Sequence, residues 1–402
     1  MKVKLPDDVA HEEGGKIVFL VMDGLGGLPD PRTGRTELEA ASTPNLDTLA
    51  KRAALGLHRP TVPGIAPGSG PGHLALFGYD PVEWNIGRGV LSALGVDFDL
   101  QHGDVAARLN FATLDGDGNI VDRRAGRPPD EENRRLVAKI RETVSEVDGV
   151  QVFFESEKEH RVVLVLRGDG LSADLSDTDP QETGVPPLPV EPLNDAARDS
   201  ADLVARVLDQ AVAAIADEPK ANGLLARGFA AFERYPSIQE RFKLKPLCIA
   251  RYPMYRGVAR LLGMDIHPVP DTDPDSITAL ERKLGEYDFV FVHFKYMDSR
   301  GEDGDHEAKQ HAIEAVDALI PRVEALNPDV LVVTGDHSTP ATYRAHSWHP
   351  VPVLIASKWC RTTPVEGFGE RECLKGELGI VEGKHLMALA LAHAGRLAKF
   401  GA

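Results

Sequence analysis

Four nearly uninterrupted apolar runs constrain what this chain can fold into. They stand at residues 16–22, 289–294, 330–334 and 351–356. An extended segment that is apolar on both sides is typical of a strand buried on both faces, and such strands occur mainly in parallel sheets. Amphipathic helices are predicted beside these runs, over about 43–54, 306–326 and 383–397. Strands that alternate with helices predict an α/β fold with a parallel sheet.

The middle of the chain follows another pattern. Its predicted elements are strands at 104–121, 150–154 and 161–167 and a helix at about 195–216. The loops between them are acidic or rich in Gly and Pro, above all at residues 174–192. This mixture predicts a smaller α+β domain inserted into the α/β domain. We therefore expect one domain of residues 1–84 and 235–402, and an inserted domain of residues 85–234.

The charge balance excludes some classes of partner. The 402 residues include 45 Lys and Arg against 62 Asp and Glu, a formal net charge of −17. Such an acidic surface argues against nucleic acid or an anionic membrane as the main partner. No apolar run approaches the roughly 18 residues of a membrane span, and the N-terminus has no apolar signal-peptide core. We expect a cytoplasmic protein, with the oligomeric state left open.

Three aspartates follow predicted strands closely. They are Asp23, Asp298 and Asp336, and His337 and His346 stand in the same C-terminal stretch as the last of them. In an open parallel sheet, ligands bind at the carboxyl ends of the strands. Each aspartate alone would most simply cap the next helix, but three carboxylates gathered at one edge would repel each other without cations between them. A set of Asp and His without Cys favours Mn²⁺, Mg²⁺ or Zn²⁺.

A candidate nucleophile stands in the loop of residues 66–73, which reads APGSGPGH. Ser69 is its one hydroxyl, placed among three glycines and two prolines. Glycine lets the backbone approach a phosphate closely, and a serine can be activated by a metal ion. Taken alone, such a loop is more often a surface turn. Beside a metal site it predicts phosphoryl transfer to Ser69.

Several motifs together identify a family. They are VFLVMDGLGGLPD, APGSGPGHLALFGYDP, GRGVLSALG, VAARLNFATLDGDGNIVDRRAGR, HRVVLVLRGDGLSADLSDTDP, VVTGDHSTP and AHSWHPVPVLIAS, in this order. The chain resembles the cofactor-independent phosphoglycerate mutases of the archaeal type, in the alkaline phosphatase superfamily. The resemblance spans roughly residues 17–397. It implies an alkaline-phosphatase-like domain with an inserted substrate-binding domain, and an isomerase of glycolysis and gluconeogenesis that interconverts 3-phosphoglycerate and 2-phosphoglycerate through a phosphoserine.

The resemblance also implies two divalent metal ions and their ligands. Ser69 would be the nucleophile, and the implied ligands of the first ion are Asp23, Asp336, His337 and Ser69 itself. Those of the second are Asp298 and His346. Glu302 stands where the family has a histidine, so we expect a carboxylate ligand there and a preference for a harder metal. His349 is the alternative replacement.

The implied substrate is a small anionic phosphoester. The residues expected to bind it are Arg88, Arg161, Asp177, Arg227, Arg256 and Lys295. Arginine binds phosphate and carboxylate with two parallel hydrogen bonds. Arg256 stands where the family usually has lysine, an exchange that is not conservative for phosphate binding.

Two other functions remain open at this point. One is a metal-dependent phosphohydrolase or mutase of the same superfamily that acts on another small phosphoester or on a phosphonate. The substituted ligand at Glu302 favours that alternative. The other is a catalytically silent binding or regulatory protein. The competent residues at Ser69 and at the expected ligand positions argue against it.

Overall fold

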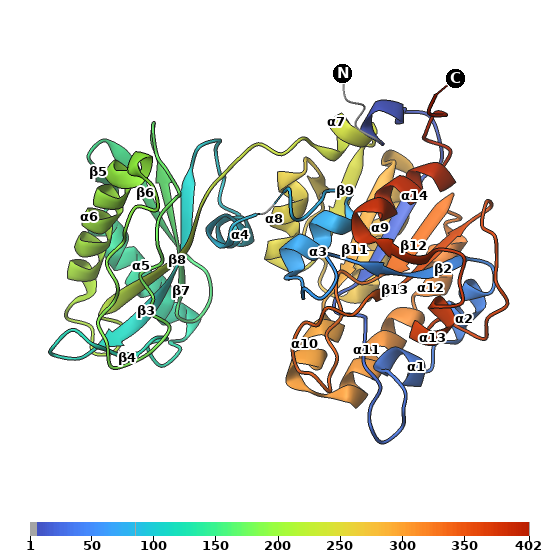
Figure 1. Ribbon diagram of the computed structural model, residues 1–402, viewed down its shortest axis with the longest axis horizontal. Coiled ribbons are helices and arrows are strands. Elements are labelled where there is room, and N and C mark those ends of the chain that lie inside the picture. The colour runs from blue at the N-terminus through green and yellow to red at the C-terminus, as the bar shows by residue number, and fades with distance from the viewer. Residues whose placement is uncertain (1–5, 85, 402) are drawn as a thin grey trace. The chain divides into compact units, whose positions relative to one another are not determined.

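The computed structural model describes residues 6–84 and 86–401. These residues form two compact units (Figure 1). The larger unit consists of residues 6–84 and 235–401, and the inserted unit of residues 86–234. The predicted fold class, a parallel-sheet α/β domain with an inserted α+β domain, is confirmed. One expectation differs, because the strand at 351–357 runs antiparallel to both of its neighbours. The substrate-binding role expected for the inserted unit stays a prediction.

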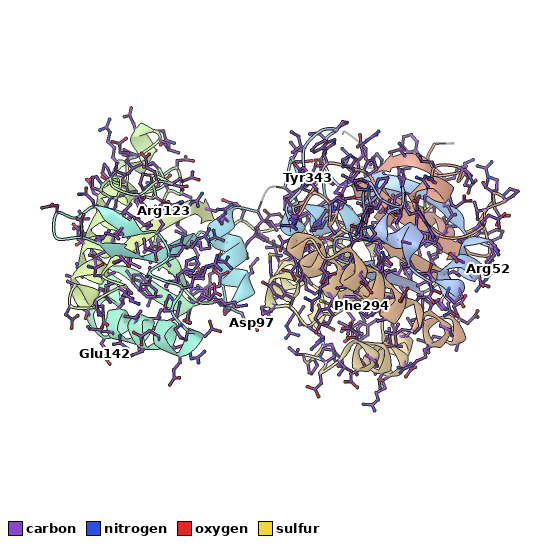
Figure 2. The ribbon with its side chains drawn as sticks, turned by 90° about the horizontal axis from the view of Figure 1, so that it is seen from below. Arg52, Asp97, Arg123, Glu142, Phe294 and Tyr343 are labelled. Carbon is purple, nitrogen blue, oxygen red and sulfur yellow. The ribbon has the colours of Figure 1, made fainter. Side chains whose placement is uncertain are left out.

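Among the described residues, the larger unit has one sheet of eight strands in the order β10-β9-β11-β1-β12-β13-β2-β14. The strands are β1 (Ile17–Met22), β2 (Ala54–Arg59), β9 (Pro246–Ile249), β10 (Asp265–Ile266), β11 (Phe289–Phe294), β12 (Val330–Thr334), β13 (Val351–Ser357) and β14 (Gly379–Glu382). Strands β1, β11 and β12 are parallel and buried along their whole length. Phe294, at the end of β11, lies among the side chains inside this unit (Figure 2).

Helices pack around this sheet. They are α1 (Glu37–Ala40), α2 (Pro44–Ala50), α3 (Ser69–Leu76), α7 (Ile238–Phe242), α8 (Pro253–Leu261), α9 (Asp273–Lys283), α10 (Tyr296–Asp303), α11 (His306–Asp317), α12 (Ile320–Ala325), α13 (Glu370–Cys373) and α14 (Leu386–His393). The helix expected over 43–54 ends earlier, because Ala54 already belongs to β2. The helix expected over 306–326 is two helices, and Pro321 in the first turn of α12 marks the break.

The inserted unit is built on an antiparallel sheet in the order β4-β3-β7-β6-β5, with β8 also paired to β3. Its elements are α4 (Arg88–Gly95), β3 (Val105–Leu114), β4 (Ile120–Asp122), α5 (Asp130–Thr143), β5 (Glu146–Val147), β6 (Val150–Ser156), β7 (Arg161–Arg167), α6 (Arg198–Ile215) and β8 (Gly223–Ala231). Helices α5 and α6 share a core with this sheet that is separate from the core of the larger unit. Within the described residues, none of the helices has both the length and the apolar character needed to cross a bilayer.

Candidate metal centre and active site

The register of the central strands gathers the predicted acids. Met22 at the end of β1 pairs with Phe294 at the end of β11, and Val21 pairs with Thr334 at the end of β12. The three strands therefore end at one level. The residues that follow them, Asp23, Asp298 and Asp336, are brought to the same edge of the sheet, and all three carboxylates are buried.

The first group consists of Asp23, Asp336 and His337, whose ligand atoms lie within 4.8 Å of one another. The Nε2 atom of His337 is 3.4 Å from Asp23 Oδ1 and 3.2 Å from Asp336 Oδ2. These two carboxylate oxygens are buried and accept no hydrogen bond. Buried oxygens without a donor are costly, and a cation would satisfy both. The group therefore fits a divalent metal ion.

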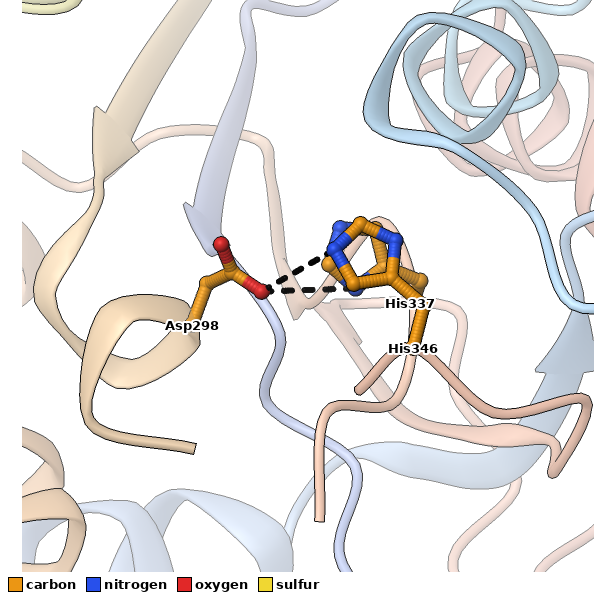
Figure 3. A group of neighbouring side chains, drawn as sticks. All are labelled: Asp298, His337 and His346. Atoms are coloured by element: carbon orange, nitrogen blue, oxygen red, sulfur yellow. Dashed lines mark ion pairs between the residues drawn. The ribbon is translucent and has the colours of Figure 1, made fainter. Parts of the chain in front are cut away.

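The second group consists of Asp298, His337 and His346 (Figure 3). Asp298 Oδ1 lies 3.3 Å from His346 Nε2 and 4.0 Å from His337 Nδ1. The two imidazole rings are stacked with their centroids 3.6 Å apart. Burial lowers the pKa of His346, but the Asp298 carboxylate outweighs it and raises the pKa to about 9. His337 belongs to both groups, whereas the sequence analysis assigned it to the first ion alone.

Glu302 lies at the edge of the second group. Its Oε1 atom is 3.9 Å from His346 Nε2, and its side chain is 56% exposed. His349 instead stacks on Trp348, and its Nδ1 atom is 3.1 Å from Ser347 Oγ. Of the two residues considered as the replacement ligand, Glu302 is therefore the one that contacts a member of the group.

Ser69 is placed against the first group by close helix packing. It is the first residue of α3, and its Oγ atom lies 3.2 Å from His337 Nε2. A Cβ atom at Gly72, one turn further along α3, would stand only 2.5 Å from the carbonyl oxygen of Asp336. Only glycine allows this approach, so Gly72 determines how near Ser69 comes to the carboxylates.

Lys295 lies between two of the carboxylates. Its Nζ atom is 3.0 Å from Asp23 Oδ2 and 2.5 Å from Asp298 Oδ2. These are the oxygens that face away from His337, so the lysine leaves the Oδ1 atom of each aspartate turned toward the histidines. Beside it opens a cavity of about 380 Å³, lined by Arg251, Tyr252, Val269, Pro270, Asp271, Asp273, His293, Lys295 and Tyr296.

Tyr255 and His293 contact Asp23 and were not predicted. The hydroxyl of Tyr255 donates a hydrogen bond to Asp23 Oδ2 and lies 3.1 Å from Lys295 Nζ. His293 Nε2 lies 3.2 Å from the same oxygen. Burial would raise the pKa of Asp23, but His293, Lys295 and His337 outweigh it and hold the pKa well below its ordinary value. A lone tyrosine and a histidine within an apolar strand give no local signal of such a role.

The inserted unit carries a second, basic pocket. Its volume is about 200 Å³, and its lining residues are Arg108, Asn110, Arg123, Arg124, Arg127, Glu159, His160, Arg161 and Arg227. Arg161 and Arg227 were predicted to bind substrate. Arg108 was not, although it pairs directly with Arg227 across β3 and β8. Burial and the nearby Arg88 lower the pKa of Arg108 to about 10.

The other predicted substrate residues have these positions. Asp177 accepts a hydrogen bond from the Gly228 amide (2.7 Å), and its Oδ2 atom is 3.7 Å from Arg227 Nε. Arg88 opens α4, where its Cβ atom would be 2.7 Å from a side chain at Gly228. Arg256 lies in the larger unit and donates to the carbonyl of His267 (2.8 Å).

The chain is similar in sequence to known proteins of one family. Residues 50–221 match the family model described as 2,3-bisphosphoglycerate-independent phosphoglycerate mutase. A probable enzyme of that name from Thermus thermophilus is 51% identical over 398 residues, which cover 98% of each chain. The chain belongs to this family. A probable mutase of the family from Thermotoga maritima is 49% identical over 401 residues, covering 100% of this chain and 99% of its own.

Two solved structures share the fold. The cofactor-independent phosphoglycerate mutase from Thermoplasma acidophilum superposes with a TM-score of 0.76 at 30% identity, over 95% of this chain and 100% of its own. A protein from Pyrococcus horikoshii superposes with a TM-score of 0.82 at 30% identity, over 97% of this chain and 100% of its own. The family predicted from the motifs is confirmed.

Proposed function

We propose that this protein is an isomerase that interconverts 3-phosphoglycerate and 2-phosphoglycerate, without added 2,3-bisphosphoglycerate, by passing the phosphoryl group through Ser69. The observation that carries the proposal is the place of the Ser69 hydroxyl. Its oxygen is 3.2 Å from His337 Nε2, beside two buried carboxylate oxygens that accept no hydrogen bond. Membership of the mutase family supports the reaction.

The first group of ligands fits a divalent ion. Asp23 Oδ1 and Asp336 Oδ2 both lie within 3.4 Å of His337 Nε2 and accept no hydrogen bond. We assign these three residues to one ion, with the Ser69 oxygen as a further ligand. Carboxylate and imidazole donors without thiolate suit Mn²⁺, Mg²⁺ or Zn²⁺.

The second group would hold another ion through Asp298 and His346, with Glu302 at its edge. When bound, the two ions would lower the pKa of the Ser69 hydroxyl and neutralise charge on the transferred phosphoryl group. The Nδ1 atom of His346 lies 2.9 Å from the carbonyl of Pro67, which turns Nε2 toward Asp298.

Other features of the protein act on the nucleophile and on the ligand beside it. Ser69 opens α3, so a phosphoryl group on its Oγ would stand at the positive end of the helix dipole. Lys295 and Tyr255 both bind Asp23 Oδ2, so Asp23 Oδ1 stays turned toward His337.

The basic pocket of the inserted unit suits a small anionic ligand. Six of its lining residues are arginines and only one, Glu159, is an acid. Arg123, labelled in Figure 2, is already paired with Asp179 through two hydrogen bonds of 2.9 and 2.7 Å. Arg227 Nη1 lies 3.6 Å from the same aspartate, without a hydrogen bond of that kind. Arg161 and Arg227, both predicted from the sequence, are our candidates for binding the anion.

The proposal is tested by following products formed from 3-phosphoglycerate in the presence of Mn²⁺. We expect 2-phosphoglycerate to form without 2,3-bisphosphoglycerate, little free phosphate, and no reaction after chelation with EDTA. Ser69→Ala should abolish turnover, because loss of a covalent nucleophile costs several orders of magnitude. The exposed Ser42, changed to Ala, is the matched control.

Free phosphate as the main product would contradict the mutase assignment. It would favour the alternative function, a phosphohydrolase of the same superfamily. Full activity of the Ser69→Ala variant would overturn the nucleophile.

A further inference from the structure

Lys309 is a fully buried lysine of α11. Its Nζ atom donates to the carbonyl oxygens of Gly26 (3.1 Å) and Thr339 (2.9 Å). The two carbonyls belong to different loops, since Gly26 follows β1 and Thr339 follows β12. Burial of an ammonium group is costly unless it is hydrogen-bonded and paired with an opposite charge. A buried lysine in this position therefore needs a nearby carboxylate.

Glu37, the first residue of α1, supplies the opposite charge. Its Oε2 atom is 4.0 Å from Lys309 Nζ, and its Oε1 atom accepts a hydrogen bond of 2.6 Å from the Ala341 amide. A Cβ atom at Gly27 would lie 2.0 Å from Oε2, so the carboxylate packs directly on that glycine. Glu37 therefore contacts the same two loops as Lys309. We call Lys309 and Glu37 the buried clamp.

The two loops joined by the buried clamp carry the proposed ligands. Asp23 is the first residue of the loop after β1, and His337 lies two residues before Thr339 in the loop after β12. The Thr339 hydroxyl donates to Asp298 Oδ1 (2.7 Å) and lies 3.0 Å from His337 Nδ1. Lys309 thus binds the carbonyl oxygen of Thr339, and the hydroxyl of the same residue orients Asp298 and His337.

We propose that the buried clamp positions the metal centre. It fixes the distance between the loops after β1 and β12, and through Thr339 it fixes the orientation of Asp298 and His337. Lys309 is a positioning residue and binds neither metal nor substrate. The inference rests on the proposed metal centre.

The direction in which cation affinity changes when Lys309 is removed distinguishes a positioning role from a purely electrostatic one. The Lys309 ammonium is near enough to Asp23 and Asp298 to interact with their charges. Its removal alone makes the site more negative, which would strengthen cation binding. If the clamp positions the ligands, its removal weakens cation binding instead. Residues that orient metal ligands typically contribute about 10- to 100-fold in affinity.

The experiment compares Mn²⁺ binding to the wild-type protein, Lys309→Met and the double variant Lys309→Met with Glu37→Gln, by isothermal titration calorimetry. The double variant removes both charges of the Lys309–Glu37 pair, so neither partner is left without the other and the fold should be retained. The metal-free proteins are compared by thermal unfolding. Lys51→Met, at an exposed lysine, is the matched control.

We expect both variants to bind Mn²⁺ at least about tenfold more weakly than the wild type, and the double variant to unfold near the wild-type temperature. Wild-type affinity in the folded double variant would overturn the inference, and so would tighter binding by Lys309→Met. Failure of the double variant to fold would overturn it too, because the clamp would then serve the fold. A wild-type protein that binds no Mn²⁺ would instead overturn the metal centre, and the inference with it.

Discussion

The hydroxyl oxygen of Ser69 lies 3.2 Å from His337 Nε2, although the two residues are 268 positions apart in the chain. Ser69 opens a helix, and His337 follows a strand at the centre of the sheet. Their contact depends on α3 lying close against the loop after β12, which Gly72 permits. The nucleophile and the metal centre are therefore joined by one packing contact between a helix and a loop.

The Gly72→Ala substitution should move Ser69 away from His337. The new methyl group would meet the Asp336 carbonyl at 2.5 Å, so α3 or the loop must move. Overpacking of this kind costs about 1–3 kcal/mol. We expect a lower unfolding temperature and a loss of turnover of at least about tenfold, since transition-state geometry is sensitive to shifts of about 1 Å.

Gly68→Ala is the control for this variant. A Cβ atom at Gly68 would meet only the Pro71 side chain, at 3.8 Å, an ordinary contact. Turnover by Gly68→Ala should stay within a few-fold of the wild type. Equal losses in both variants would show that the loop tolerates no side chain anywhere, contrary to the packing argument.

Tyr255→Phe removes the hydroxyl that donates to Asp23. A hydrogen bond to a charged group contributes about 1.5–3 kcal/mol, so kcat should fall by roughly 10- to 100-fold. Tyr252→Phe is the matched control, because that ring is 44% exposed and lies only 5.4 Å from the Tyr255 ring. Steady-state kinetics of the two variants make the comparison, and an unchanged kcat in Tyr255→Phe would remove the residue from the site.

Much of the fold could be predicted from local patterns, and some of the site could not. Continuous apolar runs predict β1, β11, β12 and β13 because burial on both faces leaves no alternation. Strand β2 was missed, since its sequence ALGLHR carries a glycine and a histidine and directly follows a helical segment. The carboxylates were predictable because each follows such a strand.

The remaining site residues depend on tertiary contacts. Tyr255 approaches Asp23 only because α8 lies beside the end of β1, which no local pattern indicates. Arg108 faces the basic pocket because β3 pairs with β8 in one register, Arg108 opposite Arg227. Sequence spacing cannot give this register, because the two strands are more than a hundred residues apart.

The third ligand of the second ion, after Asp298 and His346, can be identified with three variants. Glu302→Gln should weaken binding of the second Mn²⁺ ion, because it removes a carboxylate 3.9 Å from His346. His349→Gln should bind both ions as the wild type does. Glu302→His should shift the preference from Mn²⁺ toward Zn²⁺, which accepts imidazole readily. Metal titrations measure binding of the second ion to each variant. Weaker binding in His349→Gln alone would make His349 the ligand.

The stability of the inserted unit should depend on His160 in mildly acidic solution. Burial, with Arg161 and Arg124 nearby, lowers its pKa from 6.5 to about 4. Between these values the unfolded chain binds a proton that the folded protein does not, so stability falls as the pH falls from 6.5 toward 4. His160→Gln removes this contribution, and its unfolding temperature should fall less over that window. An identical fall in both proteins would contradict the low pKa.

The most direct test of the central claim is to look for the phosphoryl group on Ser69 itself. The protein is mixed with Mn²⁺ and 3-phosphoglycerate carrying a radiolabelled phosphoryl group, stopped in acid during turnover, and digested for peptide mapping. We predict label on the peptide that contains Ser69, its loss when unlabelled 3-phosphoglycerate is added before the acid, and its absence from Ser69→Ala. Formation of 2-phosphoglycerate with no label on the protein at any time, or label on another residue, would contradict the account.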